Sequence, residues 1–266
     1  MKIQRFIKNH KKQFFVKNRK GELTTKQLVT IIILIVSFII ILFLIFRLNL
    51  GETSNKEICH NSVILKGRTE GLIGSLDCRT NYWCISGGRD CKGISATSTI
   101  KIDMSKSSEK IKNEIMKALV DEMADCWWMF GEGKINYGGG FLNTKVYYAI
   151  CSRIVFDEKI QEKIPTITYR EFYDYLAITK KTNTQTYLQY LYATNIAENL
   201  NDGGYFKFNL ADSIDTSQGY SVITGIDMNI KILFIGNDDK VLNTFIIPTA
   251  ETGSRLVENR EFVTKA

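Results

Sequence analysis

The segment ADCWWMFGEGK, residues 124 to 134, combines a cysteine, two adjacent tryptophans and a glycine–lysine loop, all side-chain types that could do chemistry. A nucleotide-binding P-loop needs a glycine five residues before its Gly-Lys pair and a Ser or Thr directly after it. Here Trp128 and Ile135 occupy those two positions. We therefore expect no nucleotide site, and we predict no cofactor.

Carboxylates in and next to this segment offer the one broad enzymatic option. Asp121 and Asp125 lie one helical turn apart, and Glu132 follows in the loop. Glycoside hydrolysis needs two carboxyl groups that face each other across a cleft, whereas neighbours on one helix face are usually solvated. We expect that the protein is not an enzyme, and a surface hydrolase using these three residues is the second alternative.

Helical periodicity over residues 107 to 130 separates the two tryptophans. Cys126 falls within an apolar stripe, Trp127 at its edge, and Trp128 among the carboxylates. Either the GEGK loop folds back over Trp128, or the ring is displayed as a binding anchor, a common role of tryptophan at interfaces. The candidate binding residues are therefore Trp127, Trp128 and Lys134.

Metal ligation has little support. No two cysteines have the two- to four-residue spacing of zinc ligands, and His60 is the only histidine after the first 27 residues. A zinc site of His60 with Cys78, Cys84 and Cys91 is conceivable on composition alone. We predict that there is no metal.

An uncharged apolar run occupies residues 28 to 46. Nineteen residues at about 1.5 Å rise nearly match a hydrocarbon core about 30 Å thick. The run is longer than the apolar region of an ordinary secretory signal, and no small-x-small cleavage site follows it. It predicts a transmembrane helix, with the lipid bilayer as partner.

Charge gives the predicted helix an orientation. Residues 1 to 27 hold nine Lys or Arg and one acidic residue, so the remaining chain carries 26 basic and 27 acidic residues. The nearly neutral remainder argues against a nucleic-acid partner. Because cations concentrate on the cytoplasmic side of a span, we expect a cytoplasmic N-terminus and residues 49 to 266 outside the cytoplasm.

All the cysteines follow the apolar run, which agrees with an oxidising exterior and predicts a disulfide framework. Many pairings of six cysteines remain open, and the one we favour joins Cys126 with Cys151, a helix with a strand. The predicted half-cystines are Cys59, Cys78, Cys84, Cys91, Cys126 and Cys151.

The pattern along the chain is typical of an α+β fold, in which one transmembrane helix precedes a disulfide-stabilised mixed ectodomain. We expect strands at 98–104 and 146–156, two tyrosine-rich helices within 168–179 and 184–200, and strands at 205–210, 219–226, 231–236 and 241–248. The expected divisions are a basic tail (1–27), a transmembrane helix (28–48), a polar linker (49–58), a Cys-rich α+β part with loops and short strands up to residue 93 (59–160), and a helical pair with C-terminal strands in the same globular unit (161–266).

Two resemblances supplement these patterns. RKGEL, residues 19 to 23, resembles the class III signal peptide of archaeal type IV pilin-like proteins, which implies a processing site between Gly21 and Glu22. The fifth position after this site is Lys26, where pilins commonly have glutamate, and this departure counts against filament assembly. ADCWWMFGEGK, CSRIVFD (151–157) and the upstream cysteines resemble an uncharacterised group of membrane-anchored proteins of DPANN archaea over about residues 15 to 160. That resemblance implies membrane location and disulfides and brings no activity.

Together these patterns favour a single-pass, membrane-anchored cell-surface protein with a structural, adhesive or pilin-like role. Its partners would be the bilayer, copies of itself through the apolar helix, or another surface protein. The first alternative is an extracytoplasmic module that binds a ligand or carbohydrate, because tyrosines are abundant between residues 168 and 200.

Overall fold

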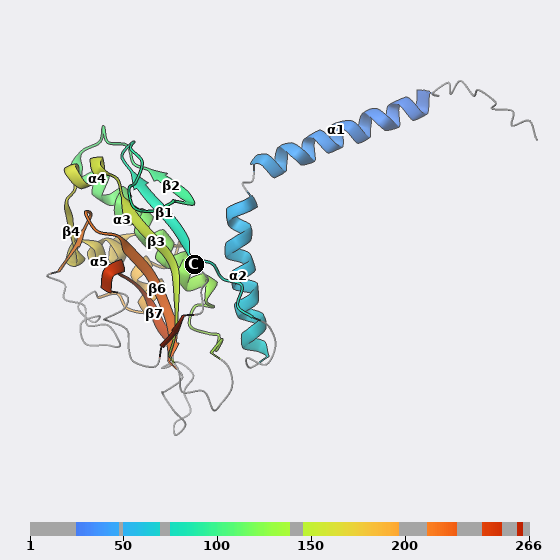
Figure 1. The fold of residues 1–266 in the computed structure, drawn as a ribbon. Helices are drawn as coiled ribbons and strands as arrows, with labels where there is room; N and C mark the ends of the chain where they lie inside the picture. Colours follow the sequence, from blue (N-terminus) through green and yellow to red (C-terminus); the bar gives the residue numbers. More distant parts are fainter. Residues whose placement is uncertain are drawn as a thin grey trace, which may run out of the picture. The chain divides into compact units, whose positions relative to one another are not determined.

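The computed structural model describes residues 25–47, 50–69, 75–138, 146–196, 212–227, 241–251 and 260–262. The chain divides into two compact units, residues 1–50 and 51–266. The first contains helix α1 (Thr25–Arg47), in which no side chain from Thr25 to Phe43 is buried (Figure 1). This helix is long and apolar enough to span a membrane. The expected N-terminal apolar helix is confirmed; the basic tail lies outside the described residues.

A six-stranded mixed sheet forms the centre of residues 51–266 (Figure 1). Its order is β2-β1-β3-β6-β7, and β8 pairs with the first residues of β3. Strands β2, β1 and β3 are parallel, whereas β6 is antiparallel to both β3 and β7. The strands are β1 (Asn81–Ser86), β2 (Ser98–Lys101), β3 (Val146–Phe156), β6 (Tyr220–Asp227), β7 (Val241–Pro248) and β8 (Arg260–Phe262).

Helix α3 (Ser108–Met129) connects β2 with β3 and packs on β3, β6 and β7. The apolar stripe expected from its periodicity is buried, with Ile111, Ile115 and Leu119 fully covered. Because β1 lies between β2 and β3, this segment is a parallel crossover within an otherwise mixed sheet. The expected helix, the strand at 146–156 and the α+β class are confirmed.

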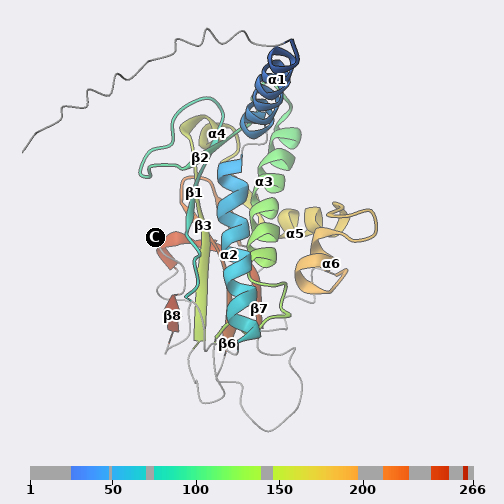
Figure 2. The same ribbon diagram turned by 90° about the vertical axis from the view of Figure 1, so that its right-hand side faces the viewer.

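A further helix, α2 (Leu50–Arg68), occupies the segment expected to be a polar linker followed by loops, so that expectation is wrong. Its inward face carries Cys59 and Val63, which are buried. Gly67 lies so close to the chain after α3 that an added Cβ would be 2.2 Å from the Cγ2 of Ile135. Helices α2 and α3 therefore lie side by side (Figure 2).

Three disulfides connect all six cysteines: Cys59–Cys78, Cys84–Cys91 and Cys126–Cys151. The favoured pairing of Cys126 with Cys151 is confirmed, and it ties α3 to the central strand β3. The bond from Cys59 fixes α2 to the segment before β1. Because Cys78, Cys84 and Cys91 are half-cystines, the zinc set that composition allowed does not exist.

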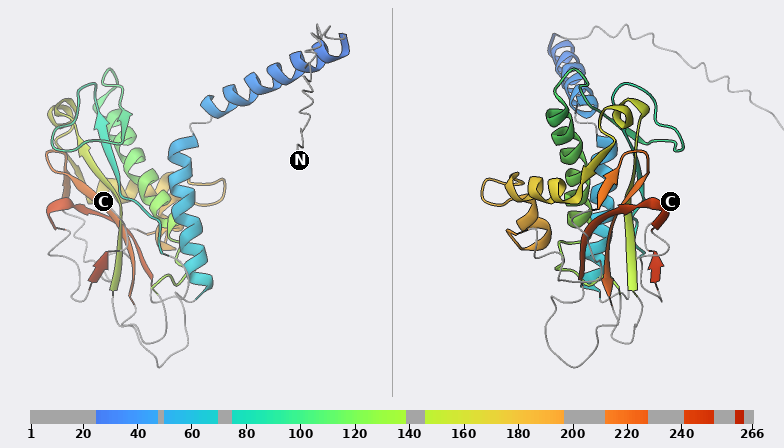
Figure 3. Two further views of the ribbon diagram at one scale, coloured as in Figure 1. Left: turned by 45° about the vertical axis from the view of Figure 1, so that its right-hand side comes forward. Right: turned by 90° about the vertical axis from the view of Figure 1, so that its left-hand side faces the viewer.

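Short helices follow the central strand. Both tyrosine-rich helices are present, as α5 and α6, and they pack against α3 and each other (Figure 3). Strands β6 and β7 confirm the expectations at 219–226 and 241–248, whereas 205–210 and 231–236 lie outside the described residues. The remaining elements are α4 (Glu158–Lys163), β4 (Thr166–Thr168), α5 (Tyr169–Ile178), α6 (Tyr187–Tyr192), β5 (Ser213–Asp215), which pairs with β4, and the 3₁₀ turn Thr249–Glu251.

Candidate functional site

The GEGK loop reverses the chain directly after α3. Gly131, Glu132 and Gly133 have φ values of 80°, 55° and 75°, in the left-handed region. The amide of Glu132 donates to the carbonyl oxygen of Trp127 (2.9 Å), which closes the turn. A side chain at Gly131 would come within 2.6 Å of Ile135. Glycine is thus required there by both conformation and space, while Glu132 bears a strain of about 1 kcal/mol.

Contacts of its side chain hold Glu132 in this position. Its carboxylate accepts hydrogen bonds from the Nζ of Lys134 (2.7 Å) and the hydroxyl of Tyr190 (2.8 Å). Burial alone would raise the pKa of Glu132, but these two donors outweigh it and lower the pKa. The carboxylate therefore stays ionised and connects the GEGK loop to α6.

Helix α6 is only one to two turns long and depends on its capping. Thr186 and Gln189 form a capping box, in which each side chain accepts from the other residue's backbone N–H. Ala193 ends the helix in the left-handed conformation. The Nζ of Lys181 lies 5.7 Å and 5.8 Å from the ring centroids of Tyr187 and Tyr190. These contacts order the loop before α6 as well as the helix.

A pocket of about 490 Å³ lies between the GEGK loop and α6. A second pocket, of about 430 Å³, shares Gln185, Gln189 and Ala193 with the first, so the two adjoin, and together we call them the α6 groove. Its volume is in the range of small-ligand sites. The lining residues are Trp127, Glu132, Lys134, Thr184, Gln185, Gln189, Tyr190, Leu191, Tyr192, Ala193 and Asn195.

The structure brings two of the three candidate binding residues together. Trp127 and Lys134 both line the α6 groove, although Trp127 is only 8% exposed. Trp128 lies elsewhere: its ring stacks on His60 of α2, with the centroids 4.1 Å apart and 14° between the planes. The Nδ1–H of His60 also donates to the carbonyl oxygen of Trp128 (2.8 Å). Trp128 is therefore covered by α2, whereas the sequence suggested the GEGK loop or exposure as an anchor.

The three candidate carboxylates have separate partners. Asp121 accepts from Lys117 and from the hydroxyl of Tyr187, both at 2.5 Å. Asp125 pairs with Lys56 of α2 at 2.5 Å. Of the three, Glu132 alone lines the α6 groove. The arrangement does not present two carboxyl groups across this groove.

A further carboxylate, Glu122 on α3, was missed by the sequence reasoning. It is 6% exposed and pairs with the Nζ of Lys56 at 3.3 Å. Burial raises the pKa of Glu122 to about 7. The positive charge of Lys56 opposes this rise, and the negative charge of Asp125 adds to the rise. Lys56 also lies 5.6 Å from the ring of Trp83 on β1. This ion pair joins α2, α3 and the sheet.

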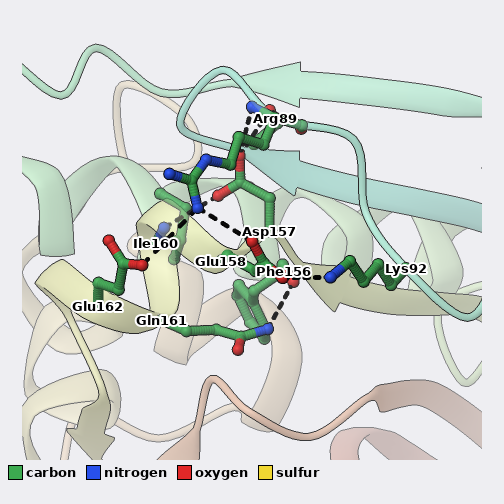
Figure 4. Close-up of polar contacts among 9 residues, drawn as sticks. Arg89, Lys92, Phe156, Asp157, Glu158, Ile160, Gln161 and Glu162 are labelled. Carbon is green, nitrogen blue, oxygen red and sulfur yellow. Dashed lines mark hydrogen bonds and ion pairs between the residues drawn. The ribbon is translucent and has the colours of Figure 1, made fainter.

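A second polar cluster lies at the start of α4, at the opposite end of β3 from β8 (Figure 4). The carboxylate of Asp157 accepts hydrogen bonds from the Ile160 amide (2.9 Å), the Arg89 amide (2.7 Å) and the Ser86 hydroxyl (3.0 Å). Exposed Glu158 beside it pairs with Arg89 and Lys92. These contacts hold the loop between β1 and β2, which the Cys84–Cys91 bond also ties to β1.

Sequence reasoning identified the aromatic and lysine contributions to the α6 groove but not its polar side chains. Gln185, Gln189 and Tyr190 were noticed only as part of a tyrosine-rich helix. The signal that points to them is the TxxQ capping box at Thr186, which marks where α6 begins. Among the described residues no group of His, Cys, Asp or Glu side chains is arranged to hold a metal ion.

No family model matches this chain, and no curated protein and no solved structure is significantly similar to it.

Proposed function

We propose that this chain is a single-pass membrane-anchored surface protein, with its N-terminus in the cytoplasm and residues 49 to 266 outside, and with a structural or adhesive role. The observation that carries the proposal is the combination of an apolar helix with a compact unit containing three disulfides. Disulfides persist in oxidising compartments, and the basic residues concentrate before the helix. Both signals support the same orientation.

Protease accessibility in intact cells tests this orientation. Protease added outside should remove the disulfide-containing unit and leave a protected fragment that contains residues 1 to 47. As a matched control, replacing the basic residues of the tail by Gln should weaken the orientation bias and leave part of the population protected. Complete protection of the wild-type protein, or free thiols throughout the folded protein, would reject the proposal.

The pilin-like version rests on the residues around Gly21, which lie outside the described residues. In this version a prepilin peptidase cuts after Gly21 and the exposed apolar helix mediates self-assembly. Mass spectrometry of the protein from its native membrane should then find Glu22 as the N-terminal residue, and Gly21→Phe should prevent cleavage. A wild-type protein that still begins at Met1 would discard this version and leave the anchored surface protein unaffected.

A second candidate function, an extracytoplasmic ligand-binding module, is favoured by the α6 groove. If a surface component occupies this groove, Lys134 should react more slowly with a lysine-modifying reagent in native cell envelopes than in purified protein. Lys101, which is exposed on β2, is the control and should react equally in both. Equal reactivity of Lys134 in the two preparations would count against an occupied groove.

A further inference from the structure

We propose that the α6 groove binds a neutral oligosaccharide; the proposal rests on the ligand-binding candidate function and names its ligand class. Three properties of the groove carry it, namely side-chain amides, a balanced charge and a largely covered apolar floor. The amides match the hydroxyls of a sugar, the charge balance argues against charged ligands, and the floor argues against wholly apolar ligands.

Side-chain amides lie where the two pockets meet. The carboxamide of Gln185 has no hydrogen-bond partner among the described residues, and Gln189 uses only its oxygen, which accepts from the amide of Thr186 at 2.8 Å. Asn195 adds a third amide at the far end. An amide offers a donor and an acceptor side by side, as does each hydroxyl of a sugar. The groove can therefore satisfy a ligand that carries hydroxyls at regular intervals.

The charge of the groove is balanced within it. Among the described residues that line it, Glu132 and Lys134 are the charged side chains, and they pair with each other at 2.7 Å. The carboxylate of Glu132 would repel a strongly anionic ligand, and a cationic ligand would compete with Lys134 for that carboxylate. A neutral ligand can accept from Lys134 and donate to Glu132 without displacing the pair.

Apolar and polar atoms line the groove in about equal measure. Trp127, Leu191 and Tyr192 are 8%, 1% and 9% exposed, so most of their area is already covered by the protein. A lipid or an apolar peptide gains affinity mainly by burying apolar surface, whereas this mixed surface matches a ligand that is itself both polar and apolar. The partly buried ring and hydroxyl of Tyr190 suit the mixed C–H and O–H surface of a sugar.

Binding should be measured with the full chain in phospholipid nanodiscs, because sugar-headed detergents would compete. The probes are immobilised linear oligosaccharides of glucose, mannose, galactose and N-acetylglucosamine, with heparin fragments and polygalacturonate as acidic probes and a random peptide library as the third class. The expected result is retention of at least one neutral oligosaccharide. Losing one neutral hydrogen bond should weaken affinity by about three- to tenfold.

Two variants locate the site. Gln185→Ala and Asn195→Ala change partly or fully exposed amides at the junction and at the far end of the groove, and each should lower the affinity for the retained oligosaccharide. Gln218→Ala, on the exposed turn before β6, is the matched control and should bind as the wild type does. The proposal is overturned if no neutral oligosaccharide is retained, if only acidic probes or peptides are, or if both groove variants bind normally. None of these outcomes bears on membrane orientation.

Discussion

Two buried carboxylates at different places in this molecule have pKa shifts in opposite directions. Glu122, between α2 and α3, is 6% exposed and has its pKa raised to about 7. Asp157, at the start of α4, is 1% exposed and has its pKa lowered. Burial raises the pKa of both, and it is the largest influence on each. The difference must come from what surrounds each carboxylate.

Hydrogen-bond donors account for this difference. The oxygens of Asp157 accept from the backbone N–H groups of Ile160 and Arg89 (Figure 4). The hydroxyl of Ser86 donates to the same carboxylate. Glu122 pairs with one lysine at 3.3 Å, which it shares with Asp125 at 2.5 Å, and a weaker interaction with the Ser152 side chain also lowers its pKa. Fixed neutral dipoles thus stabilise a buried anion better here than a single shared cation. We infer that Asp157 stabilises the fold, whereas Glu122 makes the stability of the fold depend on pH.

The largest predicted effect is this pH dependence. The folded pKa of Glu122, about 7, lies above its unfolded value of 4.5, so the folded state binds more protons between these values. Stability should therefore fall as pH rises from about 4.5 to about 7, by about 3 kcal/mol in all. Asp157 has the opposite sign: its contribution is present above an unfolded pKa of 3.8 and is lost as pH falls through its lower folded pKa.

Glu122→Gln isolates the first of these contributions, because every other titratable group is kept. Denaturant unfolding at pH 5 and pH 8 should show a smaller loss of stability for Glu122→Gln than for the wild type. An equal loss in both proteins would mean that Glu122 does not titrate in this range.

Removing the carboxylate of Asp157 should have the next largest effect. Asp157→Ala deletes the N-cap of α4 and leaves the partly buried Arg89 amide without its acceptor. The expected cost is about 2–3 kcal/mol at pH 7. Asp157→Asn keeps one acceptor oxygen and should cost about half as much, measured by the same unfolding titration. If the two variants were equally unstable, the negative charge would matter more than the acceptor geometry.

The local residues that position Asp157 were predictable in part. Asp157 directly follows a strand that the β-branched and aromatic sequence of 146–156 predicts correctly at both ends. What the sequence did not reveal is that the loop after β1 returns to this point, since Arg89 and Ser86 are about 70 residues away in the chain. Contacts at such separation depend on the sheet order, which periodicity does not encode.

Helix α2 shows why the surroundings of Glu122 were not predicted. Its segment contains Gly51, Thr53, Ser54 and Asn55, which are poor helix formers, and its inward face has few apolar residues. The helix is held by tertiary contacts instead: the Cys59–Cys78 bond, the ion pairs of Lys56 and the stacking of His60. Without α2, both Glu122 and Trp128 look like surface residues, and the α6 groove depends on similar long-range packing.

Lys56→Met tests whether the shared lysine is what lets Glu122 be ionised in its buried position. The pKa of Glu122 should rise further, and at pH 8 the protein should lose about 1–2 kcal/mol, less than for a fully buried pair because Lys56 is 20% exposed. The loss should be smaller at pH 5, where Glu122 is protonated in both proteins. Lys56→Arg keeps the charge and should lose less at pH 8. A loss independent of pH would assign the effect of Lys56 to its pair with Asp125 and its packing against Trp83, rather than to Glu122.

The smallest effect is predicted for Glu158, the neighbour of Asp157. Its carboxylate pairs with Arg89 at 3.0 Å and Lys92 at 2.5 Å, but Arg89 and Glu158 are nearly half exposed and Lys92 is mostly in solvent. Exposed ion pairs gain little because water screens the charges and the long side chains lose freedom. Glu158→Gln should therefore leave the melting temperature unchanged within error at moderate salt. A drop as large as that of Asp157→Asn would show that net charge at the start of α4, rather than buried hydrogen-bond geometry, separates this carboxylate from Glu122.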